Sequence, residues 1–134
     1  MTEEYLILGA GGHAKSVVEA IEKSGNVIMG FTDQNMEKGS VCCGYSVLGN
    51  DDVLSGLYQK GIRSAAMGIG HVGNPSVRNK VFRAAQRIGF AFPNIVHPSA
   101  VLTKRIVCGT GTQFLANCVV NTEARIGDLC IINT

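Results

Sequence analysis

The sequence predicts an α/β fold in two parts: a small parallel α/β domain over residues 1–92, and the start of a parallel β-helix over residues 93–134. Two observations lead to this prediction. As far as about residue 92, short apolar segments alternate with amphipathic segments of helical period, which is typical of a parallel sheet covered by helices. From residue 96 onward, apolar residues recur every six positions, a period that belongs neither to a helix nor to a simple strand.

Each element of the expected α/β domain has a pattern that favours it. The first strand is a short apolar run that ends in glycine, as buried parallel strands often do. The helix after it carries its aliphatic residues on one face. Asn50 and Asn74 are suited to cap two later helices. We expect strands over residues 5–8, 26–31, 45–48 and 64–69, and helices over residues 14–23, from 51 to about 60 and from 75 to about 88.

The C-terminal third repeats with a period of six residues. Its large apolar positions are Val96, Leu102, Cys108, Phe114, Val120, Ile126 and Ile132. Four residues after each of the first six lies a second, mostly small residue: Ala100, Ile106, Thr112, Cys118, Ala124 and Cys130. Short strands joined by corners and wound into a triangular prism have this period, and both positions then point inward. An ordinary series of sandwich strands is the alternative, which does not require the unbroken register.

Composition and charge narrow the function classes. Hydrophobic residues make up 46% of the chain and charged residues 16%, so we expect a packed core. A net charge of +2 gives no reason to expect nucleic acid as a partner. No apolar segment is long enough for a membrane span, and no signal peptide or metal-ligand spacing is recognisable. The five cysteines form no CxxC pair, which favours a cytoplasmic protein with reduced thiols.

A glycine-rich loop lies between the first strand and the first helix. Gly9-x-Gly11-x-x-Ala14, with Asp33 after the second strand, satisfies the Rossmann fingerprint for dinucleotides. Such a loop lets backbone N–H groups approach a phosphate at a helix N-terminus. Asp33 is placed to accept hydrogen bonds from a ribose or sugar hydroxyl. An NAD(P) site is one interpretation, although the domain is too short for both halves of a dinucleotide fold.

The three histidines and one arginine have separate interpretations. We expect His13, in the first glycine loop, to donate a hydrogen bond to a diphosphate or sugar. His71 belongs to a second glycine loop, residues 68–73, at the carboxyl end of a strand, where ligands bind in open α/β sheets. A solvated loop residue is the equal alternative for His71. His97 is interpreted as a structural residue where the repeats begin, and Arg78 as an exposed charge on its helix.

Several segments are recognisable when taken together. They are GAGGHAK after the first strand, GFTD, GYSVLG, GIGHVGNPSVR and, before the repeats, NIVHPSAVL. In this order they resemble the NeuD/PglD-like family of sugar O- and N-acetyltransferases, which are hexapeptide acyltransferases. The resemblance covers essentially all 134 residues. It implies a Rossmann-like first domain and a left-handed β-helix, against the usual right-handed preference of parallel crossovers.

The resemblance implies a substrate site in the Rossmann-like domain. The ligand would be a nucleotide sugar, UDP- or CMP-linked, or a free sugar. Asp33 would contact the nucleoside, and the family often has two acids where this chain has Asp33 and Gln34. The implied site residues are Gly9, Gly11, Gly12, His13, Asp33, Gly68 and Gly70.

The resemblance also implies a cofactor and an assembly. Family members bind acetyl-CoA on the β-helix, between the subunits of a homotrimer. A histidine beyond an INT-like segment, here residues 132–134, acts as their general base. Only about two coils precede that point. We therefore expect this chain to bind a nucleotide sugar but to lack the catalytic histidine and the acetyl-CoA site, and so to be inactive by itself.

The sequence leaves two other functions open. The first is a non-catalytic module for sugar-nucleotide binding or assembly, in which the short β-helix pairs with another chain through its unpaired strand edges. The second is an NAD(P)-binding Rossmann protein, which the glycine fingerprint alone would suggest.

Overall fold

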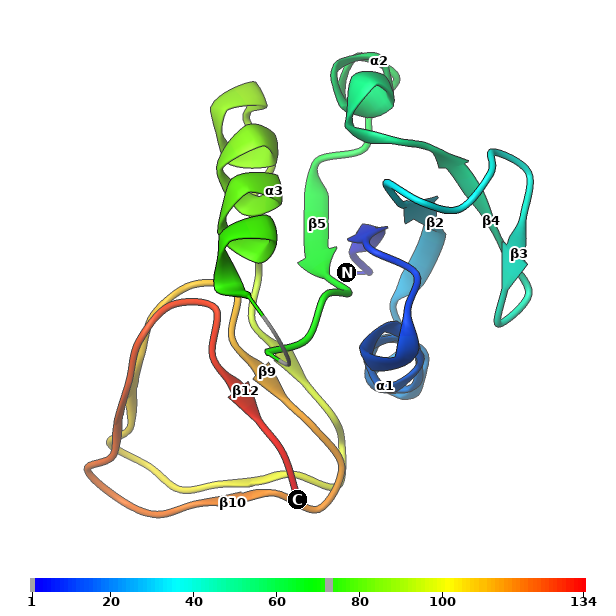
Figure 1. Ribbon diagram of the computed structural model, residues 1–134. Coiled ribbons are helices and arrows are strands. Elements are labelled where there is room, and N and C mark those ends of the chain that lie inside the picture. Colours follow the sequence, from blue (N-terminus) through cyan, green and yellow to red (C-terminus); the bar gives the residue numbers. More distant parts are fainter. Residues whose placement is uncertain (1, 72–73) are drawn as a thin grey trace.

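A parallel sheet in the N-terminal part and a triangular coil in the C-terminal part lie side by side (Figure 1). The computed structural model describes residues 2–71 and 74–134. Helices flank the sheet, and the coil begins directly after the last of them. The α/β class and the parallel strands are therefore as the sequence predicts.

The sheet has five strands in the order β3-β4-β2-β1-β5. Strands β1, β2, β4 and β5 run parallel, while the short β3 is antiparallel to β4 and was not expected from the sequence. The strands are β1 (Glu4–Leu8), β2 (Val27–Thr32), β3 (Val41–Cys42), β4 (Tyr45–Gly49) and β5 (Ser64–Met67). The expected strand over residues 64–69 ends two residues early, because residues 68 and 69 already belong to the second glycine loop.

Strand β1 is buried on both faces, as its continuous apolar run predicts. Tyr5 and Ile7 lie in one apolar cluster with helix α1 (Gly12–Lys23). Leu6 and Leu8 lie in a second cluster, on the side of helices α2 (Leu54–Gln59) and α3 (Pro75–Ile88). The sheet is thus the middle layer between two helical faces.

Two of the helices begin at the predicted asparagine caps. Helix α3 (Pro75–Ile88) follows Asn74, whose side chain accepts a hydrogen bond from the backbone N–H of Ser76. The expected helix from residue 51 to about 60 is divided into the 3₁₀ turn η1 (Asp51–Val53) and helix α2 (Leu54–Gln59). Within residues 2–71 and 74–134, no helix has the length and hydropathy that a membrane span requires.

The coil consists of two-residue strands that pair in parallel, with 18 residues between hydrogen-bonded partners. Four such pairings form three small sheets, β12-β9-β6, β10-β7 and β11-β8, so three hexads make one turn. The strands are β6 (Ile95–Val96), β7 (Val101–Leu102), β8 (Val107–Cys108), β9 (Gln113–Phe114), β10 (Val119–Val120), β11 (Arg125–Ile126) and β12 (Ile131–Ile132).

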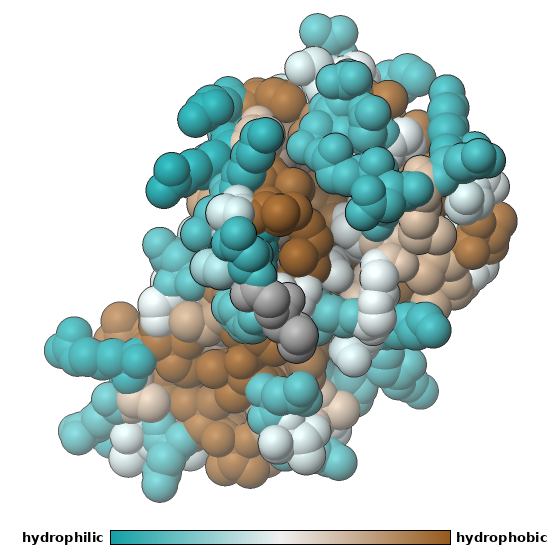
Figure 2. Space-filling view, in the orientation of Figure 1, coloured by the Kyte–Doolittle hydropathy of each residue, from teal (hydrophilic) through white to brown (hydrophobic). Residues whose placement is uncertain are grey.

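The large apolar residues of the hexads share the interior of the coil. Phe114, Cys118 and Val120 are buried at its centre, and all the other large positions pack against them. Figure 2 shows these apolar side chains gathered in the middle of the coil, with hydrophilic side chains around the edge. The inward direction predicted from the six-residue period is confirmed.

The corners of the coil adopt the left-handed backbone conformation at regular intervals. Positive φ angles occur at Arg105, Gly111, Asn117, Glu123 and Leu129, which are six residues apart. Four of these five residues are not glycine, so their conformation must be maintained by the strand pairing on each side. The six-residue period predicted corners between the strands, but it gave no indication of their left-handed conformation.

The two parts share their apolar cores. Ile95 and Leu115 of the coil belong to the cluster beneath α1. Phe92 and Leu129 belong to the cluster beneath α3, although Leu129 is a corner of the coil. The coil is therefore packed against the α/β part on both sides of the sheet.

Because Phe114 is 2% exposed at the centre of the coil, we expect Phe114→Ala to lower the free energy of unfolding by about 3–5 kcal/mol. Arg125→Ala, on an exposed strand position, is the matched control and should change it by less than about 0.5 kcal/mol. Urea unfolding monitored by circular dichroism measures both. A loss below about 1 kcal/mol for Phe114→Ala would show that the coil has no packed interior.

Candidate functional site

A cavity of about 270 Å³ lies where the two glycine loops meet, at the carboxyl ends of β1, β2 and β5. We call it the glycine-loop cavity. Its lining includes every site residue predicted from the sequence: Gly9, Gly11, Gly12, His13, Asp33, Gly68 and Gly70. In the second loop, Val72 and Gly73 lie outside the residues that the structure describes. The carboxyl edge of a parallel sheet is the usual position of a ligand site in open α/β folds.

The two glycine loops approach each other so closely that side chains are excluded between them. The backbone N–H of Gly68 donates to the carbonyl of Leu8, and that of Gly9 donates to the carbonyl of Thr32. A Cβ atom on Gly68 would collide with the carbonyl oxygen of Gly9, and Gly9 itself has φ +104°. Glycine is therefore required at both positions by close approach and by backbone conformation.

Gly11 and Gly12 instead face open space. No atom lies within 4 Å of the position of a Cβ on either residue. Helix α1 starts here, and no side chain caps its first turn. An uncapped helix N-terminus next to open space offers backbone N–H groups and positive partial charge to an anion.

Asp33 connects the end of β2 to the first glycine loop. Its Oδ2 accepts from the backbone N–H of Ala10 at 2.9 Å. Its Oδ1 accepts from the N–H groups of Asn35 at 2.8 Å and Met36 at 3.0 Å. Burial raises the pKa of this carboxyl, but the three N–H donors outweigh burial, and the pKa lies below its ordinary value. Asp33 thus has a structural task in addition to its predicted contact with a ligand.

His13 is hydrogen-bonded to a residue that the sequence did not suggest. Its Nε2 lies 2.8 Å from Oε1 of Gln113, on strand β9 of the coil. The amide Nε2 of Gln113 donates to the carbonyl of Met67 at 2.7 Å. Position 113 points out of the coil, where the hexad pattern predicts solvent, but this face of the coil lies against the α/β part and Gln113 is 1% exposed.

The other end of the cavity is rich in hydrogen-bond acceptors. Gln34 and Asp51 both line it, and Nε2 of Gln34 donates to Oδ2 of Asp51 at 2.8 Å. Burial and the neighbouring Asp52 raise the pKa of Asp51, and the bond from Gln34 opposes them. The sequence predicts only that a helix starts near residue 51 and gives no sign of this contact, because the approach of Asp51 to Gln34 depends on the fold.

A buried arginine, Arg78, lies behind the second glycine loop. Arg78 is 4% exposed, so its interpretation as an exposed helical charge is wrong. Its Nε donates to the carbonyl of Ile69 and its Nη2 to that of Leu129. Burial lowers the pKa of His71, and the positive charge of Arg78 lowers it further. Arg78 therefore holds the second glycine loop through the carbonyl of Ile69 and places a positive charge beside that loop.

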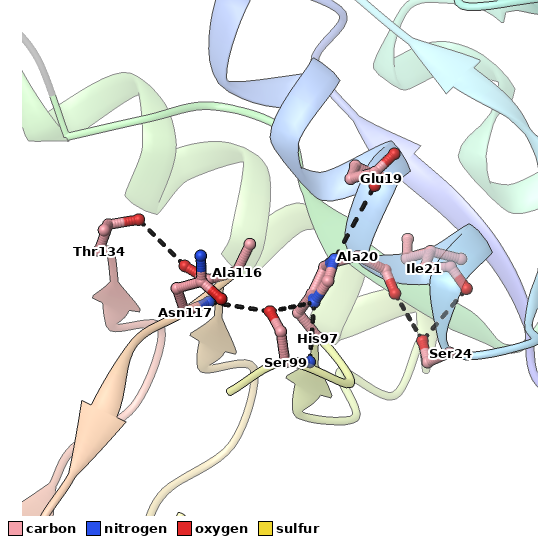
Figure 3. Close-up of polar contacts among 9 residues, drawn as sticks. All are labelled: Glu19, Ala20, Ile21, Ser24, His97, Ser99, Ala116, Asn117 and Thr134. Carbon is pink, nitrogen blue, oxygen red and sulfur yellow. Dashed lines mark hydrogen bonds and ion pairs between the residues drawn. The ribbon is translucent and has the colours of Figure 1, made fainter. Parts of the chain in front are cut away.

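His97 lies between helix α1 and the coil (Figure 3). Its Nδ1 accepts from the backbone N–H of Ser99 at 3.0 Å, and its Nε2 is 3.9 Å from a carboxylate oxygen of Glu19. The Oγ of Ser99 accepts from the N–H of Asn117 one turn along the coil. These contacts agree with the structural interpretation of His97.

No group of three or more His, Cys, Asp or Glu side chains suited to a metal ion occurs among the residues described. Five cysteines are free thiols, and the sulfur atoms of the adjacent Cys42 and Cys43 are 3.9 Å apart. None of them lines the glycine-loop cavity, although the Cys42 thiol lies 3.8 Å from the carbonyl oxygen of Ala10 in the first glycine loop.

Comparison with known proteins identifies the family. The PglD N-terminal domain matches residues 4–85, which is more than half of the chain. The chain belongs to this family. The predicted resemblance to NeuD/PglD-like sugar acetyltransferases is thereby confirmed. A comparison with curated proteins found no match.

Solved structures of acetyltransferases resemble the whole chain. A mutant of perosamine N-acetyltransferase from Caulobacter crescentus, in complex with CoA and GDP-perosamine, has 33% identity and a TM-score of 0.90, covering 100% of this chain and 61% of its own. The acetyltransferase domain of PglB from Neisseria gonorrhoeae, in complex with acetyl coenzyme A, has 29% identity and a TM-score of 0.84, with coverages of 100% and 63%. The chain thus spans about three fifths of the length of these structures. Acetyl-CoA is the cofactor of the family, as predicted.

The bonds to Asp33 predict a dependence of stability on pH. They stabilise the fold fully above the ordinary carboxyl pKa of 3.8, and this contribution is lost as the pH falls through the lower pKa of the folded state. We expect Asp33→Asn to reduce the free energy of unfolding by about 1–2 kcal/mol at pH 7. The difference from the unsubstituted chain should shrink below pH 4. Urea unfolding between pH 3 and 7 measures it, and a difference that stays constant over this range would contradict the role of the charge.

Proposed function

We propose that the glycine-loop cavity binds a nucleotide-linked sugar, and that the complete protein transfers an acetyl group from acetyl-CoA to that sugar. The observation that carries the proposal is the meeting of both glycine loops around one cavity at the uncapped N-terminus of α1. A relative with 33% identity was crystallised with CoA and GDP-perosamine. A guanosine-linked sugar therefore joins the UDP- and CMP-linked sugars expected from the sequence.

The distribution of charge in the cavity supports a bound nucleoside diphosphate. Gly11 and Gly12 form the end at the start of α1, where N–H groups and the helix dipole favour a diphosphate. Gln34 and Asp51 form the other end, where acceptors suit the hydroxyl and N–H groups of a nucleoside. A nucleoside diphosphate matches both ends of the cavity, with its phosphates at the start of α1 and its nucleoside beside Gln34 and Asp51.

We propose further that the coil over residues 93–134 is part of a left-handed β-helix, the second domain after a Rossmann-like domain over residues 1–92. Parallel strands repeating every three hexads support this. A homotrimer joined through the coil is supported by the paired valines Val101 and Val119, which are 53% and 68% exposed. Light scattering that found only monomers of the complete protein would count against the trimer.

We expect the 134-residue chain by itself to bind a nucleotide sugar without transferring an acetyl group. His13 and His97 are held by hydrogen bonds within the fold, and His71 is exposed and does not line the glycine-loop cavity, so we infer that none of the three acts as the general base that the family resemblance implies. Release of CoA from acetyl-CoA in the presence of amino-sugar nucleotides, followed with a thiol reagent, would contradict this expectation.

Isothermal titration calorimetry with GDP-, UDP- and CMP-sugars tests the binding proposal directly. We expect at least one to bind with a Kd below about 1 mM, and Gly11→Ala to weaken it by about tenfold, because the added methyl group enters the open space of the cavity. Gly56→Ala, where a Cβ also meets open space but lies outside the cavity, is the matched control and should bind as the unsubstituted chain does.

Two outcomes would contradict the nucleotide-sugar site. One is the absence of heat with every nucleotide sugar at millimolar concentration. The other is a fluorescence titration in which NADH binds more tightly than any of them, which would favour the NAD(P) interpretation of the glycine fingerprint.

A further inference from the structure

Gln113 is a buried amide of the coil that reaches into the α/β part. It lies on β9, the central strand of the sheet β12-β9-β6, and its backbone N–H donates to the carbonyl of Cys130 at 2.9 Å. A strand paired on both sides holds its side chains in place more firmly than an edge strand. The Gln113 side chain, 1% exposed, ends between Met67 at the end of β5 and His13 at the start of α1.

The bond to Met67 determines which way the amide faces. A backbone carbonyl only accepts hydrogen bonds, so the atom of Gln113 that approaches Met67 at 2.7 Å must be the NH₂ group. The oxygen, Oε1, is then left for the imidazole of His13 at 2.8 Å. The assignment of the amide follows from its partner and does not depend on the ring.

The amide in turn determines the hydrogen positions on the ring. Since Oε1 only accepts, Nε2 of His13 must carry the hydrogen of this bond. A neutral imidazole has one N–H, so its lone pair is then on Nδ1. No hydrogen bond joins Nδ1 to another of the described residues, and His13 lines the glycine-loop cavity.

We propose that Gln113 is a positioning residue for ligand binding: it holds His13 as the Nε2–H tautomer, so that the neutral ring presents Nδ1 to the bound ligand as an acceptor. This inference rests on the proposed nucleotide-sugar function. It also changes the role expected from the sequence, where His13 donates to a diphosphate or sugar. The partner of neutral His13 is instead a donor on the ligand, namely a hydroxyl or amino group of the sugar or a ribose hydroxyl.

The tautomer is measured first, without any ligand, from the ¹⁵N chemical shifts of His13 at a pH where the ring is neutral. We expect the Nε2–H form in the unsubstituted chain. Gln113→Glu should retain it when its carboxyl is protonated, because the O–H then donates to the carbonyl of Met67 in place of the NH₂ group and the other oxygen still accepts from Nε2. Gln113→Met, of similar size but unable to accept, should yield a mixture of tautomers. A mixture or the Nδ1–H form in the unsubstituted chain would overturn the proposal, whether or not Gln113→Met folds.

The affinity for the tightest-binding nucleotide sugar is measured second, by calorimetry. We expect Gln113→Met and His13→Ala each to weaken binding by about tenfold, and the double variant to bind no more weakly than His13→Ala alone. Additive losses in the double variant would overturn the positioning role. If no nucleotide sugar binds the unsubstituted chain, the proposed function fails and the ligand part of this inference fails with it, while the chemical shifts still report on the contact between the two residues.

Discussion

The burial of strand β1 on both of its faces is the constraint on which the rest of the structure depends. Tyr5 and Ile7 face one apolar cluster, and Leu6 and Leu8 face the other. Helices must therefore cover both sides, and the strands next to β1 run parallel to it through crossover connections. Their carboxyl ends meet at one edge, and the chain must turn away from the sheet there. The glycine-loop cavity is the result of these turns.

The coil completes the site as well as following it in the chain. Leu129 adds a side chain to the core beneath α3, and its carbonyl accepts from the buried guanidinium of Arg78, which also supports the second glycine loop. Gln113 reaches His13 in the first loop. The first glycine loop is thus hydrogen-bonded directly to the coil, and the second is connected to the coil through Arg78. The coil and the loops around the cavity are therefore joined by direct hydrogen bonds that are partly or fully buried.

The periodic features of the structure could be predicted from the sequence. The features that depend on contacts between different elements could not. The inward position of Phe114 follows from a six-residue period, and the approach of Gly9 to the cavity follows from a fingerprint with a known geometry. Gln113 and Arg78 were missed for one physical reason. Periodicity shows which face of its own element a side chain occupies, but it does not show whether another element covers that face.

Asp33 illustrates a different limit of the sequence. Its place at the end of β2 was expected from the fingerprint, and it does line the cavity. Its bonds to the backbone of Ala10, Asn35 and Met36 arise from loop conformations, which no periodic pattern encodes. The presence of an acid at this position could thus be predicted. That both of its carboxylate oxygens already accept hydrogen bonds from the backbone could not.

The left-handed corners of the coil restrict how its length can change. Because Arg105, Gly111, Asn117, Glu123 and Leu129 lie six residues apart, a single inserted residue would move every later corner out of line with the turn beneath it. The inward column would face outward from that point on. An insertion of one full turn would instead restore each pairing and each corner. Because the corners recur every six residues, their spacing tolerates insertions of whole hexads, and only an insertion of three hexads also keeps each later strand on its present side of the coil.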